Sequence, residues 1–590
     1  MSLRDLYCGQ VTKENLNQSL KLSGWVAKSR DHGGVIFIDL FDHTGVVQLV
    51  FNPECEAFPI AEKLTTHSVI CVAGTVAMRP EGTVNPNLAT GEVEVNVNTL
   101  AWHNIAAPLG FDVNDPKVSE EVRAQYRVLD IRSERMQKHL RFRAEMIQSL
   151  RQYLESQSFL EVETPILTRS TPEGARDYLV PSRQSPGHAF ALPQSPQQFK
   201  QMLMMGGIDR YYQFAKCFRD EDLRADRQPE FTQLDMEMSF MSVDEVCEMM
   251  EGMVKHMLKS CLNLEFDAFP VMSYDDAIRY YGTDAPDLRN PLKFIPLDDV
   301  LSDCGFEVFK SPAVSDEGRV VAIKLPNGCE LLSRKDLDQY TNFVSKLGAK
   351  GLAYIKVTDL SLDNFEGLNS PILKFLDEQH IQGILDACQA ENGDIIFFGA
   401  GDAYTVNLSI HGLAKKLAQD HGLLEDGYRF VWVKDFPMFE KIEGGVTAVH
   451  HPFTAPLASD EADLLNAKAQ AYDLVLNGSE LGGGSIRISN PKLQQAVFDL
   501  LGIDDAHAKE EFGHLLTALS QGCPPHGGLA FGIDRMAMVL LGANSIRDVI
   551  AFPKTQTATC ALTKAPGKVV KAQWRELSLS VKEGDKHGGA

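Results

Sequence analysis

The feature that most constrains this chain is a pair of strand-like runs on either side of a highly charged loop. Residues 211–219 and 231–240 read as the strands and residues 220–230 as the loop. In the second strand a period of two separates an apolar face from a face with one aromatic and three polar groups. The apolar face comprises Thr232, Leu234, Met236, Met238 and Phe240, and the other comprises Phe231, Gln233, Asp235 and Glu237. We therefore expect an antiparallel hairpin that packs on one side.

Two residues of this hairpin suit nucleotide chemistry. Arg219 ends the first strand, and its planar guanidinium fork fits a phosphate. Phe231 begins the return strand and could stack on a flat heterocycle. The alternative is a solvated hairpin whose charges carry no function.

A glycine-rich strand enters an apolar helix at residues 526–540. Arg535 falls in the first helical turn, where free N–H groups and the helix dipole favour an anion. The glycines remove side chains that would block a ligand. Taken alone, the pattern also fits a helix that merely packs on a sheet.

Helical spacing appears earlier, before a strand-like run that ends at Pro165. The residues at helical spacing are Leu140, Ala144, Ile147, Leu150 and Leu154. Upstream, residues 20–26, 35–41, 46–51, 68–76 and 92–97 read as short strands, typical of a five-stranded barrel. Such a barrel binds oligonucleotides or is simply a structural β-module.

Length, charge and cysteines limit the class of protein. A chain of 590 residues exceeds one hydrophobic core, so we expect three or more domains. A net charge of −23 argues against binding nucleic acid by bulk electrostatics, so RNA contacts must be local. The 11 scattered cysteines, without a Cys-x-x-Cys pair, and the lack of a long apolar run indicate a cytoplasmic protein without a membrane segment.

Together, three segments resemble the motifs of class II aminoacyl-tRNA synthetases. Motif 1 matches the helix and strand ending at Pro165, motif 2 matches Phe218-Arg219-Asp220-Glu221 with its return strand, and motif 3 matches Gly532-Ile533-Asp534-Arg535. Residues 171–180, 191–200, 218–227 and 450–454 are similar to segments of the bacterial-type aspartate-tRNA ligases. The resemblance covers nearly the whole chain.

This resemblance implies an α+β fold with an inserted domain. The expected parts are an OB-fold anticodon-binding barrel (1–108), a linker (109–135), a class II domain with an antiparallel sheet flanked by helices (136–290 and 420–560), an inserted α+β domain of the bacterial, GAD-like type (291–419) and a C-terminal extension (561–590). Motif 1 implies a homodimer interface.

The implied reaction forms aspartyl-adenylate from ATP and then charges tRNA. By the resemblance, Arg219 bridges the aspartate carboxylate and the α-phosphate, Arg535 holds the γ-phosphate, and Phe231 with Arg535 encloses adenine. Further implied ATP contacts are Asp220, Glu221, Gln228, Glu480, Gly532, Ile533 and Asp534. Asp473 and Glu480 are the implied ligands of Mg²⁺, which prefers oxygen donors.

The resemblance also implies an aspartate pocket. Lys200 and Arg487 would bind the side-chain carboxylate, and His450 would close the pocket as a charge-sensitive lid. The residues implied near the ammonium group are Glu173, Gln197 and the assisting Ser195. In isolation, Lys200 and His450 would more often be structural or solvated.

Contacts to tRNA are implied in two places. Arg224 and Arg227 lie in the motif 2 loop near the acceptor end. On the barrel, Phe37 would stack on an anticodon base, Gln48 would bond its edge and Arg30 would touch the anticodon. A buried Phe37 is the alternative.

Two loop residues bear on the choice of tRNA. Family members that charge both tRNA(Asp) and tRNA(Asn) tend to carry His and Gly at the positions of His32 and Gly82. We therefore expect relaxed specificity, with an amidotransferase that converts Asp-tRNA(Asn). A strictly tRNA(Asp)-specific enzyme, with His32 and Gly82 as ordinary turn residues, is the alternative.

Two other functions stay open at this point. A lysine or asparagine enzyme would share the motifs but needs an acidic or neutral pocket, which Lys200 and Arg487 disfavour. A non-catalytic RNA-binding paralogue would lose chemistry residues, yet Arg219, Glu221 and Arg535 are present.

Overall fold

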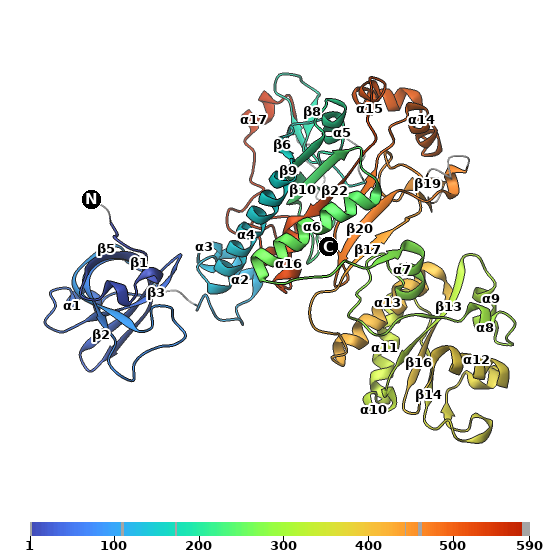
Figure 1. Cartoon of the computed structure of the whole chain (residues 1–590), viewed down its shortest axis with the longest axis horizontal. Helices are drawn as coiled ribbons and strands as arrows, with labels where there is room; N and C mark the ends of the chain where they lie inside the picture. Colours follow the sequence, from blue (N-terminus) through green and yellow to red (C-terminus); the bar gives the residue numbers. More distant parts are fainter. Residues whose placement is uncertain (1–2, 108–110, 171–173, 443, 458–462, 581–590) are drawn as a thin grey trace. The chain divides into compact units, whose positions relative to one another are not determined.

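The computed structural model describes residues 3–107, 111–170, 174–442, 444–457 and 463–580 (Figure 1). The chain divides into two compact units, Met1–Gln137 and Lys138–Ala590. Among the described residues, none of the helices combines the length and the apolar character needed to cross a membrane.

The first unit holds a closed barrel of strand order β1-β2-β3-β5-β4, which confirms the expected barrel. Its strands are β1 (Ser19–His32), β2 (Val35–Asp42), β3 (Gly45–Phe51), β4 (Val69–Met78) and β5 (Val93–Asn104), with the short helix α1 (Phe58–Ala61). Alternate residues of β2 point inward, so Ile36, Ile38 and Leu40 are buried. The segment expected as a linker instead carries two short helices, α2 (Glu120–Gln125) and α3 (Arg127–Asp130).

The second unit is organised by an eight-stranded sheet of order β11-β17-β20-β21-β22-β10-β9-β6. The strands are β6 (Leu160–Glu161), β9 (Arg210–Phe218), β10 (Glu230–Ser239), β11 (Val271–Ser273), β17 (Phe430–Lys434), β20 (Ala471–Leu476), β21 (Ser479–Ile486) and β22 (His526–Gly532). The outermost pairs, β6 with β9 and β11 with β17, are parallel, and the pairs between them are antiparallel. The expected antiparallel sheet is therefore confirmed, with a parallel pair at each edge.

Three helices pack on one face of this sheet (Figure 1). They are α4 (Glu134–Ser156), α6 (Val243–Leu262) and α16 (Ile533–Leu540). The α4 stripe that reaches the core is Phe142, Met146, Leu150 and Leu154. Two details of the predicted pattern are wrong, because Ala144 is exposed and Phe240 lies beyond the end of β10, 71% exposed with a φ of 57°.

Other elements surround the sheet. They are α5 (Gln197–Met205), α7 (Tyr274–Tyr281), α14 (Pro491–Leu500), α15 (Asp505–Leu519), α17 (Lys571–Glu576) and the two-stranded pairs β7 (Leu179–Pro181) with β8 (Ala189–Ala191) and β18 (Phe439–Ile442) with β19 (Gly445–Ala448). Helix α5 contacts β10 and α15.

A second sheet, of order β12-β13-β16-β14-β15, lies within the segment expected as an insertion. Its strands are β12 (Ile295–Pro296), β13 (Gly318–Leu325), β14 (Ala353–Val357), β15 (Leu368–Asn369) and β16 (Ile395–Asp402). Its helices are α8 (Asp298–Leu301), α9 (Glu307–Ala313), α10 (Gly328–Leu331), α11 (Arg334–Lys346), α12 (Glu378–Cys388) and α13 (Ala403–Asp420). Helices α11 and α13 pack on one face, and α8, α9 and α12 on the other. Domain boundaries finer than the two units stay a prediction.

Candidate functional site

A polar pocket of about 510 Å³ opens on the face of the eight-stranded sheet opposite α4 and α6. Its walls come from α5, the β9–β10 hairpin, β20, β21, β22 and the start of α16. The predicted site residues that line it are Ser195, Gln197, Lys200, Arg219, Glu221, Arg227, Gln228, Phe231, His450, Asp473, Glu480, Arg487, Gly532, Asp534 and Arg535. The fold therefore gathers most of the predicted site from segments far apart in the sequence.

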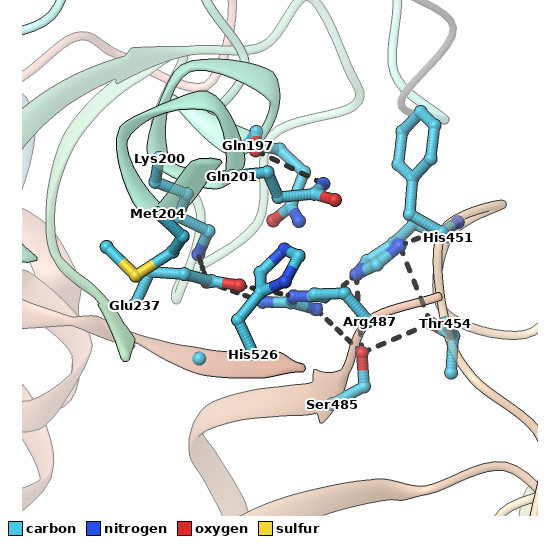
Figure 2. Close-up of polar contacts among 12 residues, drawn as sticks. Gln197, Lys200, Gln201, Met204, Glu237, His451, Thr454, Ser485, Arg487 and His526 are labelled. Atoms are coloured by element: carbon cyan, nitrogen blue, oxygen red, sulfur yellow. Dashed lines mark hydrogen bonds and ion pairs between the residues drawn. The ribbon is translucent and has the colours of Figure 1, made fainter. Parts of the chain in front are cut away.

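The floor of the pocket is a buried network of opposite charges, which we call the floor network. Figure 2 shows four of its members, Lys200, Glu237, His451 and Arg487. The floor network comprises Lys200, Asp235, Glu237, His451 and Arg487. Lys200 Nζ lies 2.6 Å from Asp235 Oδ1 and 3.4 Å from Glu237 Oε2. The guanidinium of Arg487 donates to both carboxylate oxygens of Glu237, at 2.9 and 3.1 Å. Both cations thus have internal partners before any ligand binds.

Burial and neighbouring charge act in opposite directions on the two carboxyl groups. Burial raises the pKa of Asp235, although Lys200 beside it works the other way. Burial also opposes ionisation of Glu237, but the charges of Arg487 and Lys200 outweigh it and lower its pKa. Glu237 is therefore the fixed anion of the floor network.

The adjacent histidines have different surroundings. His451 receives a hydrogen bond from Arg487 on Nε2, and burial followed by the charge of Arg487 lowers its pKa well below the ordinary value. His450 stacks obliquely on Phe436 at 4.7 Å, with Nε2 4.0 Å from Asp473 Oδ1. Burial lowers the pKa of His450 to about 4. Both rings are neutral at pH 7, and the predicted charge sensitivity of His450 stays a prediction.

The upper half of the pocket is richer in arginine. The Arg219 guanidinium lies 5.2 Å from the centroid of the Phe231 ring, a cation–π contact. Arg535 donates to the backbone oxygen of Glu480 at 3.1 Å and to Asp226 at 3.4 Å. Enclosure of adenine by Phe231 and Arg535 stays a prediction, since here Arg219 occupies the face of the ring.

Several predicted ATP contacts serve the fold in this structure. The Gln228 amide accepts from Lys554 N at 2.7 Å and donates to Lys554 O at 3.1 Å. The Asp534 carboxylate accepts from Thr232 N at 2.8 Å and from Arg143 Nε at 2.9 Å, which joins α16 to β10 and α4. Ile533 is completely buried in the core, so its side chain faces no ligand.

Two carboxylates meet above Gly483. A Cβ placed there would lie 2.2 Å from Asp473 Oδ1 and 3.4 Å from Glu480 Oε1, so glycine keeps the space between them open. Burial raises the pKa of both carboxyl groups, and repulsion from Glu480 raises the pKa of Asp473 further. Among the described residues, no cluster of three or more His, Cys, Asp or Glu side chains could hold a metal by itself. Two oxygen donors nevertheless fit Mg²⁺, which keeps waters and phosphate oxygens as its other ligands.

The remaining predicted residues of this unit lie around the pocket. Arg227 pairs with Glu221 at 3.2 Å, and Arg224 is exposed in the same loop. The side-chain nitrogen of Gln197 is buried and has no hydrogen-bond partner among the described residues. Asp220 is exposed and joins Arg176 through its backbone, whereas Glu173 lies outside the described residues.

Sequence reasoning missed several residues of the site. These are the partners Asp235, Glu237, His451, Ser485 and Arg143, together with Asp284, which lines the pocket. The polar period of the return strand did single out Asp235 and Glu237, but nothing in the sequence says that they are buried. His451 directly follows the predicted His450.

The barrel places its predicted residues on an outward face. Arg30 pairs in register with Phe37, and Gln48 lies opposite Asp39. Phe37 is half-buried, and its stacking on an anticodon base stays a prediction. Arg30 Nη2 bonds Asp39 at 2.7 Å, and Gln48 Nε2 donates to Glu94 at 2.9 Å.

The two residues tied to the choice of tRNA, His32 and Gly82, belong to the same barrel. His32 lies near this outward face, and Gly82 lies in a loop. His32 ends β1, and its ring lies 5.9 Å from that of Phe37. It is therefore a strand residue, and Gly33 and Gly34 make the turn with φ of 65° and 90°. Gly82 has a φ of 84° and open space around its Cβ position, as an exposed turn residue has.

Comparisons with known proteins identify the family and the fold. Residues 20–101 match a family model described as OB-fold nucleic acid binding domain. The chain is 52% identical, over 98% of both chains, to proteins named Aspartate--tRNA(Asp/Asn) ligase from Legionella pneumophila strains Corby and Paris. The solved asparaginyl-tRNA synthetase of Pyrococcus horikoshii complexed with asparaginyl-adenylate shares the fold, with a TM-score of 0.60, 19% identity and coverage of 93% of this chain and 98% of that chain. Residues 119–556 match the model of the tRNA synthetases class II (D, K and N), and the chain belongs to this family.

Proposed function

We propose that this protein ligates L-aspartate to tRNA(Asp) and to tRNA(Asn) by way of aspartyl-adenylate. Membership of the class II family implies the use of ATP, a tRNA and an amino acid. The relatives at 52% identity are named for aspartate and for both tRNAs. The observation that carries the choice of amino acid is the pair of buried cations, Lys200 and Arg487, in the floor of the pocket.

The floor network suits aspartate better than its competitors. Free aspartate carries an ammonium group and two carboxylates, so it needs both signs of charge, and the floor network offers both. Lysine would bring a second cation towards Lys200 and Arg487, and asparagine has no side-chain charge for them. Because Asp235 and Glu237 hold the cations in place, little reorganisation is needed when the substrate binds.

Adenylate formation needs positioning more than a nucleophile. The aspartate α-carboxylate attacks the α-phosphorus of ATP and releases pyrophosphate, after which a terminal ribose hydroxyl of tRNA attacks the adenylate carbonyl and releases AMP. Arg219 stabilises the negative charge that develops on the α-phosphate, and Arg535 holds the γ-phosphate. Mg²⁺ held by Asp473 and Glu480 would neutralise phosphate charge.

The barrel supplies the contacts to the anticodon. Phe37 offers an aromatic face, and Gln48 and Arg30 offer polar groups beside it. His32 and Gly82 lie where a strict enzyme would need further contacts to reject tRNA(Asn). Arg224 and Arg227 contact the acceptor end, and Glu173, Gln197 and Ser195 contact the substrate ammonium.

Further partners follow from the same proposal. A homodimer would cover the exposed apolar side chains Leu160, Ile166 and Leu167, which are 52%, 48% and 54% exposed at and beyond the edge strand β6. The protein works in the cytoplasm, where an amidotransferase converts Asp-tRNA(Asn).

The deciding experiment charges tRNA(Asp) and tRNA(Asn) transcripts with labelled aspartate, after aspartate-driven ATP–pyrophosphate exchange has been established. Values of kcat/KM for the two tRNAs within about tenfold of each other support the dual specificity. A preference of roughly 100-fold or more for tRNA(Asp) shows instead that the enzyme is specific for tRNA(Asp). Absence of exchange with Mg·ATP and aspartate would leave the non-catalytic paralogue.

A barrel variant separates the two halves of the proposal. Phe37→Ala should raise KM for tRNA about tenfold, because stacking on one base is lost, and should leave exchange unchanged. Equal damage to exchange would contradict the assignment of the barrel to tRNA alone.

A further inference from the structure

The C-terminal end of α7 is capped by the inserted domain. Arg319 Nη1 and Nη2, from β13, donate to the backbone oxygens of Ile278 and Arg279, both at 3.0 Å. The backbone nitrogen of Phe294 donates to Tyr280 O at 2.8 Å. The ring of His411, on α13, bonds Tyr281 O at 3.0 Å. The last turn of α7 thus has partners from three separate parts of the insertion, where a free helix end would turn to water.

This cap is closely packed. Arg319 also bonds the Asn407 side chain, and its guanidinium lies 5.5 Å from the Phe294 ring. Gly282 follows α7 with a φ of 67°, and a Cβ there would lie 2.5 Å from the Phe294 ring and 3.1 Å from Asn407 O. The turn therefore holds one conformation against the insertion.

The segment that leaves this turn enters the pocket. Asp284, two residues after Gly282, lines the pocket together with Asp473, Glu480 and Arg535. Beyond it, Asp287 packs against the turn that joins β20 to β21, with its Cβ 3.1 Å from the Cβ position of Gly478. These two strands carry Asp473 and Glu480.

We infer that the inserted domain, through Arg319 and His411, fixes Asp284 as a third carboxylate beside the proposed metal–ATP site. This rests on the proposed function. Within the described part of the chain, Asp284 belongs to no cluster of three or more side chains that could hold a metal by itself. Its carboxylate would add negative charge beside Asp473 and Glu480, which would favour a bound divalent cation. Arg319 is then a positioning residue, and the insertion acts on ATP binding without touching the nucleotide.

The test compares three full-length variants with the unaltered protein. Asp284→Asn removes the charge, Arg319→Met removes the cap, and Lys324→Met is the matched control. Lys324 lies on the same strand, bonds Gln389 O at 2.8 Å and pairs with Asp394, but makes its contacts inside the insertion. The readouts are the Mg²⁺ dependence of exchange and, without aspartate, calorimetric binding of ATP with and without Mg²⁺.

Asp284→Asn and Arg319→Met should each raise the half-saturating Mg²⁺ concentration about fivefold and weaken Mg·ATP binding similarly. Neither should change KM for aspartate or weaken binding of metal-free ATP, and Lys324→Met should change nothing. The double variant should match Asp284→Asn alone, since both act through one carboxylate.

Two outcomes would overturn the inference. An unchanged Mg²⁺ dependence in Asp284→Asn removes the role of this carboxylate. If the Arg319→Met protein is less stable but binds Mg·ATP normally, the inserted domain has no role in ATP binding. If Arg319→Met does not fold, His411→Gln is used for the same test. Failure of the proposed function is distinct: exchange would then be absent from the unaltered protein, while Mg·ATP binding still reports on Asp284.

Discussion

The floor and the upper half of the pocket use cations in different ways. In the floor network the Lys200 and Arg487 side chains are each 2% exposed and are held by Asp235 and Glu237. In the upper half the Arg227 and Arg535 side chains are 39% and 29% exposed, and their carboxylate contacts, at 3.2 and 3.4 Å, are longer than the shortest contacts of Lys200 and Arg487, at 2.6 and 2.9 Å. The floor is thus built by folding, whereas the upper half keeps arginines that can exchange their partners for phosphate.

This difference has an energetic origin. A buried charge must be paired within the protein, because desolvation is costly and no water compensates it. A half-exposed arginine retains water, so a weak internal partner suffices and a ligand can replace it. Mutations in the two regions should therefore separate folding from catalysis.

The largest effect is expected for Arg487→Met. It leaves Glu237 buried without its bidentate partner, which should destabilise the fold by about 3–5 kcal/mol and abolish exchange. Urea unfolding and exchange measure the two effects. The double variant Glu237→Gln/Arg487→Met should recover much of the stability and none of the activity. A single variant as stable as the parent would mean that the floor network is not structural.

Arg219→Ala should show the opposite separation. Its guanidinium lies over the Phe231 ring, and its Nε has no hydrogen-bond partner among the described residues. Exchange should fall about 10²–10³-fold because charge on the α-phosphate loses its stabilisation. The free energy of unfolding should change by less than about 0.5 kcal/mol. A large loss of stability would erase the distinction between the two regions.

A third variant tests whether Arg143, on α4, supports the upper half of the pocket. Arg143 on α4 bonds Asp534, next to Arg535, and also donates to Thr232 Oγ1 at 3.2 Å. Arg143→Met should therefore raise KM for ATP about fivefold and cost about 1–2 kcal/mol of stability, with KM for aspartate unchanged. Lys255→Met, which removes the α6 ion pair with Glu251, is the control and should leave both KM values unchanged. Equal rises in both KM values would indicate general loosening of the fold.

The sequence predicts which residues form the site better than it predicts their hydrogen-bond and ion-pair partners. Local spacing predicts the segment from Gly532 to Arg535 and the 211–240 hairpin, because strand and helix geometry fix that spacing. The partnership of Glu237 with Arg487 joins residues 250 positions apart, and no local pattern encodes it. The same holds for Gln228, whose amide is bound to the backbone of Lys554, and for Arg319, whose partners lie on α7.

The smallest expected effect concerns pH and lies where the two halves meet, at His450. Its pKa is about 4 in the folded protein and near 6.5 in the unfolded chain, because burial disfavours the charged ring. As pH falls from 6.5 towards 4, the unfolded chain binds a proton that the folded chain does not, so this residue lowers the free energy of unfolding; above pH 6.5 it contributes nothing. His450→Gln should therefore lose less stability than the parent between pH 7 and about 5 in urea unfolding.

His451, whose pKa is lowered likewise, is present in both proteins, so its contribution cancels when the two are compared. Asp473, whose pKa burial raises, contributes the opposite slope in both. If the stability of the parent and of the variant depended on pH in the same way, water would reach His450. This ring would then lie outside the buried floor network.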